Sequence, residues 1–415
     1  MPPRTTEVPD HLRVDFDVFN PELTNPVDQF QDEVAKLAAI GPVVFSTAHG
    51  GHWVVTGYDE IQEVMRDPDL FSSWPNDIMP HGAGGGRTLP LELDPPEHTA
   101  YRHALQPLFN PNRMKALEKI IRSTTNELID GFAGRGSAEF VSEFAHDLPA
   151  RVFLGLMDLP MSDAPLFTEA TDIFVKGRPE LGEEASGRAK EEALQSMLDY
   201  FTRVVEERKG RTEVGSDVTS VIVRTPVEIN GETRTFTDVE LSNMFHLLLV
   251  AGLHTVQGSL AWSILHLSQH PDQRQKLIDD PSLLPSAVEE ILRIEGAVSP
   301  GRRATRDTVL ADVPIKAGDQ LLLSLARGNR DEREFSNPAA VDIERRPNRH
   351  LSFGSGPHRC LGSHLARIEL AIAVEEIHRR IPDYRLDPAD PPIWHPSQVR
   401  GVIRMPILFT PERSG

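Results

Sequence analysis

The pattern of apolar and polar residues predicts a small β region near the start of the chain. Val43–Ser46 and Trp53–Thr56 are apolar runs on either side of Ala48–Gly51, a short segment that contains two glycines. Runs of β-branched and aromatic residues separated by such a segment are typical of a β-hairpin. We therefore predict two antiparallel strands here.

The region that follows has the residue spacing of amphipathic helices. From about Pro96 to Arg211 apolar residues recur every three or four positions. Two clear examples are the sets Met114, Leu117, Ile120, Ile121 and Leu194, Met197, Leu198, Phe201. This spacing places the apolar side chains on one face of a helix, so we predict helices that pack through one face.

The longest predicted helix runs from Thr237 to about His270. Thr237 and Glu240 have the spacing of a capping box, and Pro271 ends the helical pattern. At 1.5 Å per residue, about 33 residues extend roughly 50 Å, enough to cross the molecule. The middle of this segment, Leu247–Leu253, is apolar on every side, which indicates a helix buried in the core.

The remaining elements are shorter. A further helix is expected over about Pro285–Ile294, and short strands at Val309–Ile315, Gln320–Ser324 and Val399–Phe409. No linker, charge block or repeat marks a domain boundary. We expect a mainly α fold with a minor β component and a single domain over residues 1–415. Residues 1–10 are expected to form a loose arm, and the β-rich regions lie near 40–60 and 300–325.

Composition excludes several classes of protein. The apolar share of 39% is that of a globular chain, and the formal net charge of −19 argues against a protein that binds the phosphate backbone of nucleic acids. The first residues lack the apolar segment of a signal peptide, and we see no stretch that resembles the roughly 18–20 uncharged apolar residues of a membrane span. We expect a cytoplasmic protein with no nucleic-acid or membrane partner.

Cys360 is the only cysteine, which excludes an intrachain disulfide and any multi-cysteine metal site. Three interpretations remain from the residue alone: buried core, nucleophile, or a sole thiolate ligand. Gly354, Gly356 and Pro357 form a stiff turn that would let a flat ligand approach the backbone closely. Helical periodicity begins directly after the cysteine, and a helix N-terminus favours a thiolate. This combination suits a thiolate bound to iron.

The residues around this sulfur resemble the haem-binding motif of the cytochrome P-450 family. The motif Phe-x-x-Gly-x-His-x-Cys-x-Gly is complete in Phe353, Gly356, His358, Cys360 and Gly362. The resemblance extends from about Pro9 to Phe409. It implies the helical prism of that family with a long central helix, and one haem b per chain with Cys360 as the axial ligand of the iron.

Two further sets of residues match the same family. Glu290 and Arg293 resemble its Glu-x-x-Arg pair, and Arg345 is expected to be the third member of a structural triad that holds the cysteine loop. By the same resemblance, the haem propionates would be bound by His98 and Arg102, which lie four apart on one helix face, together with Arg302 and His358.

The segment Ala251-Gly252-Leu253-His254-Thr255 of the long helix resembles the helix segment that lies over the haem iron in proteins of this family. Gly252 is unfavourable by about 1 kcal/mol in a helix interior, and space for a diatomic ligand is one compensation. Thr255 can donate to the Ala251 carbonyl and open the helix locally. His254 departs from the family pattern, which has a carboxylate at this position. An imidazole can also relay protons, so we treat a proton-shuttle role for His254 as a hypothesis.

The resemblance implies a bacterial-type monooxygenase that inserts one atom of O2 into an apolar substrate. The resemblance also implies a separate [2Fe-2S] ferredoxin and its reductase as electron donor. His81–Gly86 lacks the strand-to-helix setting of a dinucleotide fingerprint, so we do not expect NAD(P)H to bind to this chain. The ferredoxin would dock on a basic patch formed by Arg102, Arg113, Lys115, Arg359 and Arg367.

The substrate pocket is expected, by resemblance, to include the loop 74–91 together with Phe174, Leu248, Val298, Ser299 and Val399. The segments Phe16–Pro21 and Gly50–Trp53 resemble the camphor-hydroxylating branch, which suggests a terpenoid or other small ring compound. Three alternatives remain open: a haem sensor without turnover, peroxide-driven or non-oxygenating haem chemistry, and a cysteine hydrolase. The last of these would be colourless when purified.

Overall fold

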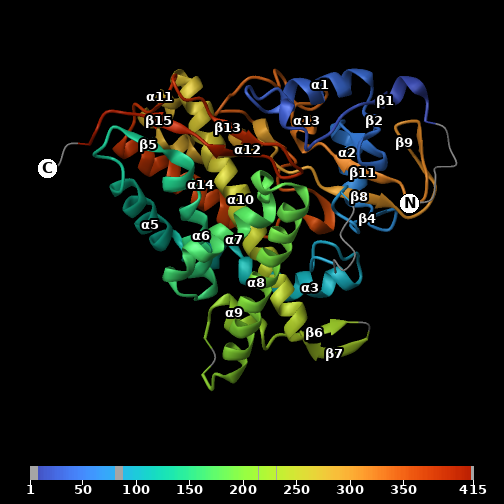
Figure 1. Cartoon of the computed structure of the whole chain (residues 1–415), viewed down its shortest axis with the longest axis horizontal. Helices are drawn as coiled ribbons and strands as arrows, with labels where there is room; N and C mark the ends of the chain where they lie inside the picture. Colours follow the sequence, from blue (N-terminus) through green and yellow to red (C-terminus); the bar gives the residue numbers. More distant parts are fainter. Residues whose placement is uncertain (1–7, 80–86, 214, 230, 413–415) are drawn as a thin grey trace.

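The computed structural model describes residues 8–79, 87–213, 215–229 and 231–412, and it has the predicted mainly helical fold with small sheets (Figure 1). The helices are α1 (Phe30–Ile40), α2 (Tyr58–Arg66), α3 (Glu97–Leu105), α4 (Pro111–Lys115), α5 (Glu118–Asp130), α6 (Asp147–Met157), α7 (Ala164–Lys176), α8 (Glu183–Gly210), α9 (Val218–Ile222), α10 (Asp238–Gln269), α11 (Pro271–Asp279), α12 (Leu284–Glu295), α13 (Leu325–Gly328) and α14 (Ser363–Arg380). A π-helical turn, η5 (Val141–Ala145), precedes α6.

The strands are short and form several small sheets. They are β1 (Arg13–Val14), β2 (Val43–Ser46), β3 (His52–Val55), β4 (Phe71–Ser72), β5 (Ser137–Glu139), β6 (Pro226–Ile229), β7 (Glu232–Thr235), β8 (Gly301–Ala304), β9 (Thr308–Leu310), β10 (Val313–Ile315), β11 (Gln320–Leu323), β12 (Arg385–Leu386), β13 (Ile393–His395), β14 (Gly401–Arg404) and β15 (Pro406–Leu408). In Figure 1 the largest sheet lies at the upper right, beside α2, and helices fill the rest of the molecule.

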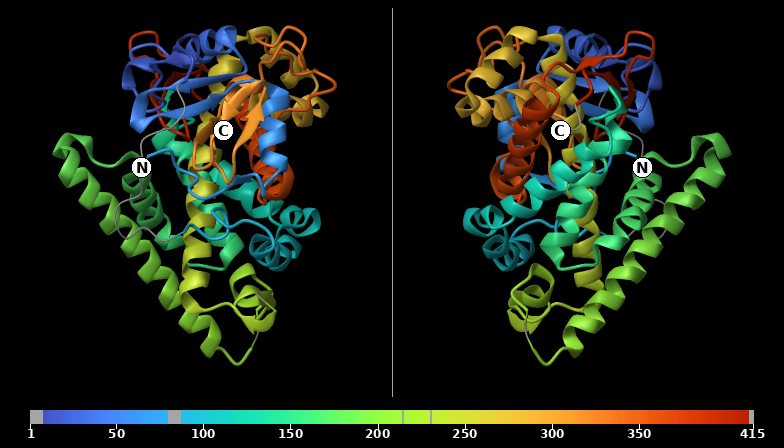
Figure 2. Two further views of the ribbon diagram at one scale, coloured as in Figure 1. Left: turned by 90° about the vertical axis from the view of Figure 1, so that its right-hand side faces the viewer. Right: turned by 90° about the vertical axis from the view of Figure 1, so that its left-hand side faces the viewer.

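Helix α10 crosses the centre of the molecule, as its sequence predicts (Figures 1 and 2). The Thr237 hydroxyl accepts from the backbone N–H of Glu240, and the Glu240 carboxylate accepts from the Thr237 N–H, so the predicted capping box is confirmed. The expectation that no stretch of the chain resembles a membrane span was wrong for this helix. α10 is long and apolar enough to cross a membrane, but 67% of its most apolar window is buried inside the protein, because it is a core helix.

Two hydrophobic clusters meet on α10. Its N-terminal half, from Leu241 to Leu253, packs with residues of α6, α7 and α8, whereas its C-terminal half, from Val256 to Leu267, packs with residues of α5, α12 and α14. Figure 2 shows α8 as a long diagonal helix that approaches α10 near the narrow end of the molecule. The central helix therefore joins two parts of the core.

The two predicted β-rich regions form one sheet, with strand order β1-β2-β3-β11-β8-β4. The predicted hairpin is confirmed as the antiparallel pair β2 and β3, although β3 begins one residue earlier than expected. β11 then pairs in parallel with β3, which brings the region near 320 beside the region near 54. A third cluster of apolar residues, which includes those of α2, covers this sheet.

Two predicted strands are each divided in the structure. The stretch Val309–Ile315 forms two antiparallel strands, β9 and β10, because Ala311 and Asp312 adopt positive φ angles of 46° and 62° and reverse the chain. The stretch Val399–Phe409 divides into β14 and β15, which pair with different partners. The β6–β7 hairpin was not predicted.

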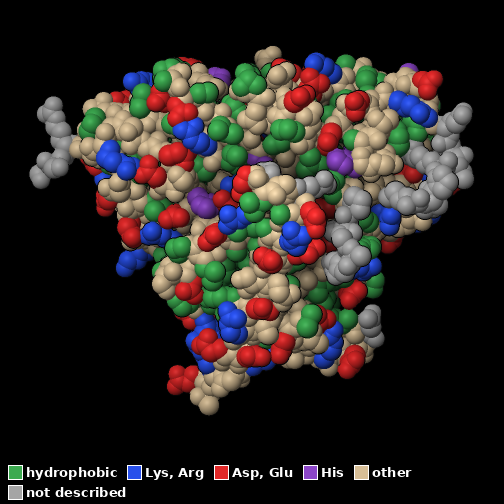
Figure 3. All heavy atoms as spheres, viewed as in Figure 1, with side chains coloured by type: hydrophobic (Ala, Val, Ile, Leu, Met, Phe, Trp, Pro, Cys, Tyr) green, Lys and Arg blue, Asp and Glu red, His purple; other side chains and the backbone are tan. Residues whose placement is uncertain are grey.

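The N-terminal arm and the glycine-rich loop are only partly described. Residues 1–7 and the segment His81–Gly86 lie outside the described residues. Within the expected arm, Val8 is buried against the sheet and Asp10–Leu12 forms a 3-10 helical turn. On the face seen in Figure 3, acidic and basic side chains are interspersed.

Candidate active site

The cysteine loop is held by its own backbone and by neighbouring side chains. The Cys360 N–H donates to the Phe353 carbonyl over 2.7 Å, and the Leu351 N–H donates to Oδ1 of Asn329 over 2.6 Å. The Phe353 ring packs under the guanidinium of Arg367, at 4.3 Å from its centre. The loop therefore presents its sulfur from a fixed backbone.

The two glycines of this loop differ in what they contact. Both have positive φ angles, 70° at Gly354 and 68° at Gly356, a conformation that favours glycine. Gly354 lines the internal cavity described below. A Cβ on Gly356 would lie 2.4 Å from the Met65 carbonyl oxygen, so this glycine allows the loop to pack on the end of α2. Gly356 also lines the surface pocket beside Cys360.

Three buried residues, Glu290, Arg293 and Arg345, meet beneath the loop, as the triad prediction requires. The Glu290 carboxylate accepts from Nε of Arg293 over 2.7 Å and from Nε of Arg345 over 3.0 Å. The remaining donors of the two arginines reach backbone carbonyls between residues 329 and 340. Burial raises the pKa of Glu290, but its hydrogen bonds and opposite charges outweigh burial and hold that pKa below its usual value. These three residues thus fix the segment that leads to the cysteine loop.

The sulfur of Cys360 lies between an internal cavity and a pocket at the surface, because both are lined by Cys360. Burial raises the pKa of the thiol, and this effect outweighs the Gly362 backbone N–H and the positive charges of Arg102, Arg359 and Arg367. The Gly362 N–H, at the start of α14, lowers this pKa as the sequence expectation requires, but burial has the larger effect. A coordinated metal reverses this balance, because a metal-bound thiol is deprotonated.

The internal cavity has a volume of about 430 Å³ and is mainly apolar. The cysteine loop lines it, and so do Ala251, Gly252, His254 and Thr255 of α10. A Cβ on Gly252 would meet no atom within 4 Å, so the glycine leaves open space above this part of the helix. The Thr255 hydroxyl donates to the Ala251 carbonyl over 2.7 Å, as predicted, while α10 remains continuous rather than opening.

Four basic side chains, His98, Arg102, Arg302 and His358, also line this cavity. Arg302 is buried, donates to the Gly301 carbonyl and forms no ion pair with any described residue. Burial lowers its pKa to about 10. The rings of His98 and His358 lie 4.0 Å apart, and burial together with neighbouring positive charges lowers the pKa of His98 to about 4. The cluster therefore favours an anionic group.

These observations test whether the residues fit a haem. A thiol, open space over a helix, apolar walls and the buried Arg302, which forms no ion pair with any described residue, all line one cavity. A haem has an iron that binds thiolate, a flat apolar ring and two carboxylates, so its chemistry matches each of these features. The residues present fit the group.

The predicted substrate residues fall into two groups. Leu248, Val298 and Val399 line the cavity, and Val298 and Val399 face each other in an isolated β-bridge. Phe174 does not line it, because its ring packs edge-on against His246 with the centres 5.1 Å apart, and Val175 takes its place. Ser299 is also outside the wall, where its backbone N–H donates to the Gln398 carbonyl.

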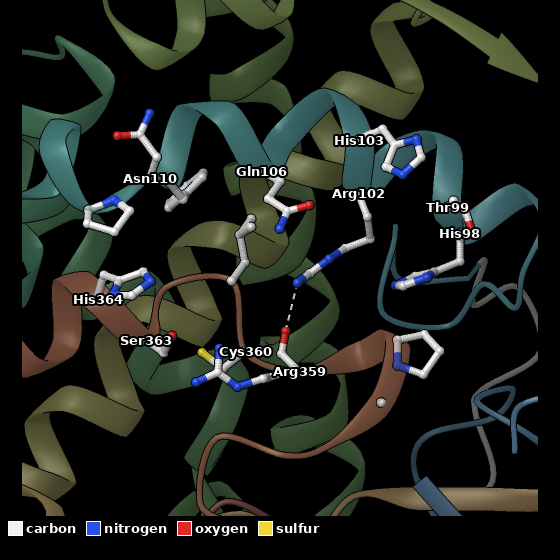
Figure 4. A pocket seen from close by; sticks show the side chains of 15 residues that line it. His98, Thr99, Arg102, His103, Gln106, Asn110, Arg359, Cys360, Ser363 and His364 are labelled. Carbon is white, nitrogen blue, oxygen red and sulfur yellow. Dashed lines mark hydrogen bonds between the residues drawn. The ribbon is translucent and has the colours of Figure 1, made fainter. Parts of the chain in front are cut away.

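The surface pocket beside the sulfur has a volume of about 440 Å³ (Figure 4). Figure 4 shows α3 on one side of it and the cysteine loop on the other, joined by a hydrogen bond from Arg102 to the Arg359 carbonyl over 2.8 Å. Its lining includes His103 and His364 and no acidic residue. Of the expected basic patch, Arg113 is bound to the Ser216 carbonyl and Arg367 to Glu289, whereas Lys115 and Arg359 are exposed.

Sequence reasoning missed two acidic residues at this site. Asp172 on α7 lies 3.7 Å from Nε2 of His254, and no local pattern indicates that these two helices meet there. Glu369 on α14 lines the cavity, and burial without a partner raises its pKa well above the usual value. The signal for Glu369 was a lone carboxylate between Ile368 and Leu370.

Comparison with known proteins agrees with the site. The family model described as Cytochrome P450 matches residues 183–388. The chain is 33% identical over 378 residues to cytochrome P450 CYP107DY1 of Priestia megaterium, which covers 87% of this chain and 90% of that protein. It is 34% identical to the 20-oxo-5-O-mycaminosyltylactone 23-monooxygenase of Streptomyces fradiae, over 91% of this chain and 89% of the relative.

Solved structures give the same result at the level of the fold. The crystal structure of CYP101J2 superposes with a TM-score of 0.87 and 29% identity, over 98% of this chain and 100% of the other. That of CYP101C1 gives a TM-score of 0.86 and 29% identity, over 97% and 98%. Both are CYP101 proteins and belong to the camphor-hydroxylating branch, the branch that the sequence was expected to resemble.

Proposed function

This chain belongs to the cytochrome P450 family and is a monooxygenase, and from that premise we propose its substrate class, cofactor and electron donor. We propose that it inserts one oxygen atom of O2 into a small hydrophobic compound, with electrons from a separate [2Fe-2S] ferredoxin and its reductase. We further propose one haem b in a single catalytic domain over residues 1–415, in the cytoplasm.

The single observation that carries this proposal is the composition of the internal cavity. Cys360 and the segment Ala251–Thr255 line the same space, together with Arg302, a buried cation that forms no ion pair with any described residue. Cys360 would bind the iron, and His98, Arg102, Arg302 and His358 would hold the propionates. When bound, the haem supplies the activation of O2, which a thiolate ligand favours.

The chain's own residues would supply space, protons and a dry pocket. Gly252 leaves room beside α10, and the Thr255 hydroxyl donates to the Ala251 carbonyl, which leaves its oxygen free to accept a further hydrogen bond. Burial lowers the pKa of His254 to about 4, so this imidazole is neutral at pH 7 and able to accept a proton. The apolar wall, which includes Leu248 and Val399, would exclude water and hold the substrate.

The substrate remains a small terpenoid or ring compound in this proposal. Support comes from the apolar wall of the cavity and from the CYP101 proteins among the structural neighbours. The curated relatives act on chemically different molecules, which their names give as 20-oxo-5-O-mycaminosyltylactone and methyl-branched lipids. A screen of hydrophobic compounds for a change in the spin state of the iron would select the class.

The ferredoxin would dock over the surface pocket beside the sulfur. Basic groups and no acidic residues line this pocket, which favours an acidic partner. The rate of reduction should fall partly as salt concentration rises, because salt screens exposed charges. A rate that is indifferent to salt would contradict this docking site.

The decisive test is the ferrous–carbonyl absorption spectrum of the purified protein and of Cys360→Ala. We expect the thiolate-type spectrum in the wild type and its loss in the variant. Unchanged pigment and unchanged product formation in Cys360→Ala would refute the proposal. Steady O2 consumption with NADH, the ferredoxin partners and a hydrophobic substrate would exclude a haem sensor. Turnover with peroxide alone would favour peroxide-driven chemistry, the alternative that His254 supports.

A further inference from the structure

A group of titratable side chains lies where α7 packs on α10, next to the cavity wall. It consists of Asp172 and Lys176 on α7, His146 after η5, and His254 on α10. His254 lines the cavity, whereas the other three side chains do not. The group therefore begins at the cavity and extends away from it.

The polar atoms of this group converge on one carboxylate. Oδ1 of Asp172 lies 3.2 Å from Nε2 of His146 and 3.7 Å from Nε2 of His254. Its other oxygen, Oδ2, accepts from Nζ of Lys176 over 2.8 Å. Oδ1 and both Nε2 atoms are buried, and none of them has a hydrogen bond to a described residue. These three atoms face one another, so the carboxylate oxygen is the shared partner that both buried ring nitrogens approach.

The side chain that lines the cavity is the least exposed of the four. The His254 side chain is 8% exposed, whereas those of His146, Lys176 and Asp172 are 19%, 21% and 31% exposed. A proton can thus reach the group from its exposed side and leave from the side that lines the cavity.

The charges of the group make His254 a neutral base with an ionised neighbour. Burial lowers the pKa of His254 to about 4, the charge of Asp172 opposes this effect, and Lys176 and His146 reinforce it. Burial raises the pKa of Asp172, but His146 and Lys176 hold it well below the usual range. The other titratable groups within electrostatic reach are His395 on β13 and Lys190 on α8. At pH 7 the ring is therefore neutral and can take up a proton on one nitrogen and release one from the other.

We propose that Asp172 is a positioning residue for proton delivery to the cavity. Its carboxylate holds the imidazole of His254 with Nε2 toward α7 and stabilises the ring while the ring carries a proton. One proton arrives at Nε2 from the α7 side, and one leaves the ring for an acceptor in the cavity. No electrons move and Asp172 stays ionised. The inference rests on the proposed function, in which the reduction of O2 consumes protons.

The test compares Asp172→Asn with Glu169→Gln in the haem-loaded enzyme. Glu169 is an exposed carboxylate on the same helix and serves as the matched control. Loss of an opposite charge at this distance lowers the pKa of an imidazole by roughly one to three pH units. Turnover of Asp172→Asn should therefore fall about tenfold or more at pH 7. Its solvent deuterium isotope effect should rise, while the ferrous–carbonyl spectrum and thermal midpoint stay those of the wild type.

Two further measurements separate positioning from a purely structural role. The conservative variant Asp172→Glu keeps a carboxylate beside His254, so it should retain most of the turnover that Asp172→Asn loses. The infrared band of carbon monoxide bound in the cavity should shift in Asp172→Asn and not in Glu169→Gln, because His254 lines that space.

The outcomes distinguish the inference from the function on which it rests. A wild type without a thiolate-type carbonyl spectrum or product would reject the proposed function itself. In a wild type that passes this test, the inference is overturned if Asp172→Asn keeps its turnover and isotope effect within twofold. It is also overturned if the loss in Asp172→Asn accompanies a loss of haem and thermal stability, or if a folded Asp172→Glu variant loses as much turnover as Asp172→Asn.

Discussion

Replacing Glu290 by Gln should destabilise the folded protein by about 3–5 kcal/mol, because it leaves two buried guanidinium groups without a counter-charge. The Glu290 side chain is completely buried, with Arg293 also completely buried and Arg345 8% exposed. Its two oxygens accept from both arginines, from the Asp342 N–H over 2.9 Å and from Nδ2 of Asn348 over 3.1 Å. The substitution keeps the size of the side chain but replaces one carboxylate oxygen by an NH2 group. This group faces the N–H groups that donate to Glu290 in the wild type.

This loss is a large part of the whole stability, since folded domains are stable by only about 5–15 kcal/mol. Urea unfolding of Glu290→Gln, followed by circular dichroism and by haem absorbance, measures it. The control is Glu344→Gln, which removes an exposed carboxylate paired with Lys276 over 2.7 Å and should change stability by less than about 1 kcal/mol. A free energy of unfolding for Glu290→Gln within about 1 kcal/mol of that control would refute the view that the triad of Glu290, Arg293 and Arg345 holds the cysteine loop.

Three other predictions concern the loop, the cations and acid stability. Gly356→Ala should lose roughly 2–4 kcal/mol of stability, because its Cβ would meet backbone at 2.4 Å with φ at 68°, whereas Gly362→Ala meets nothing within 4 Å and should unfold like the wild type in urea. Arg302→Leu should stabilise the haem-free protein, because it removes a buried cation without an ion pair to a described residue. The same variant should release haem to apomyoglobin at least about tenfold faster than the wild type. A variant that loses both haem-free stability and haem retention would contradict this prediction. Burial raises the pKa of Glu289 and of Glu295, but basic partners lower both to about 2 from 4.5. Their stabilisation is therefore complete above pH 4.5 and lost as pH falls toward 2, so the thermal midpoint should fall across this range, and a flat profile would argue against it.

The sequence predicts those features whose causes are local. The start of α10 follows from the capping box of Thr237 and Glu240, and its end from Pro271. The triad contacts of Glu290 require a partner distant in sequence, and the family resemblance identified this partner as Arg345. Motifs therefore located the sulfur and the central helix well.

Contacts between distant segments explain what the sequence did not predict. Gly356 packs on the end of α2, and Asp172 meets His254, through the way helices cross in space. The error at Phe174 is one of helix rotation, since adjacent residues point about 100° apart and Val175 faces the cavity instead. Such angles depend on packing, which a linear pattern does not contain.

The position of Ala251–Thr255 between the two halves of the core has a consequence for how this chain tolerates changes in its length. Inserting one residue into α10 ahead of this segment would turn everything beyond it by about 100° and shift it by 1.5 Å. Gly252 and Thr255 would then leave the cavity while Trp262 and Ile264 lost their packing. We therefore expect the chain to tolerate insertions and deletions in its connecting loops and not in the central helix, whose number of residues sets which side chains face the cavity.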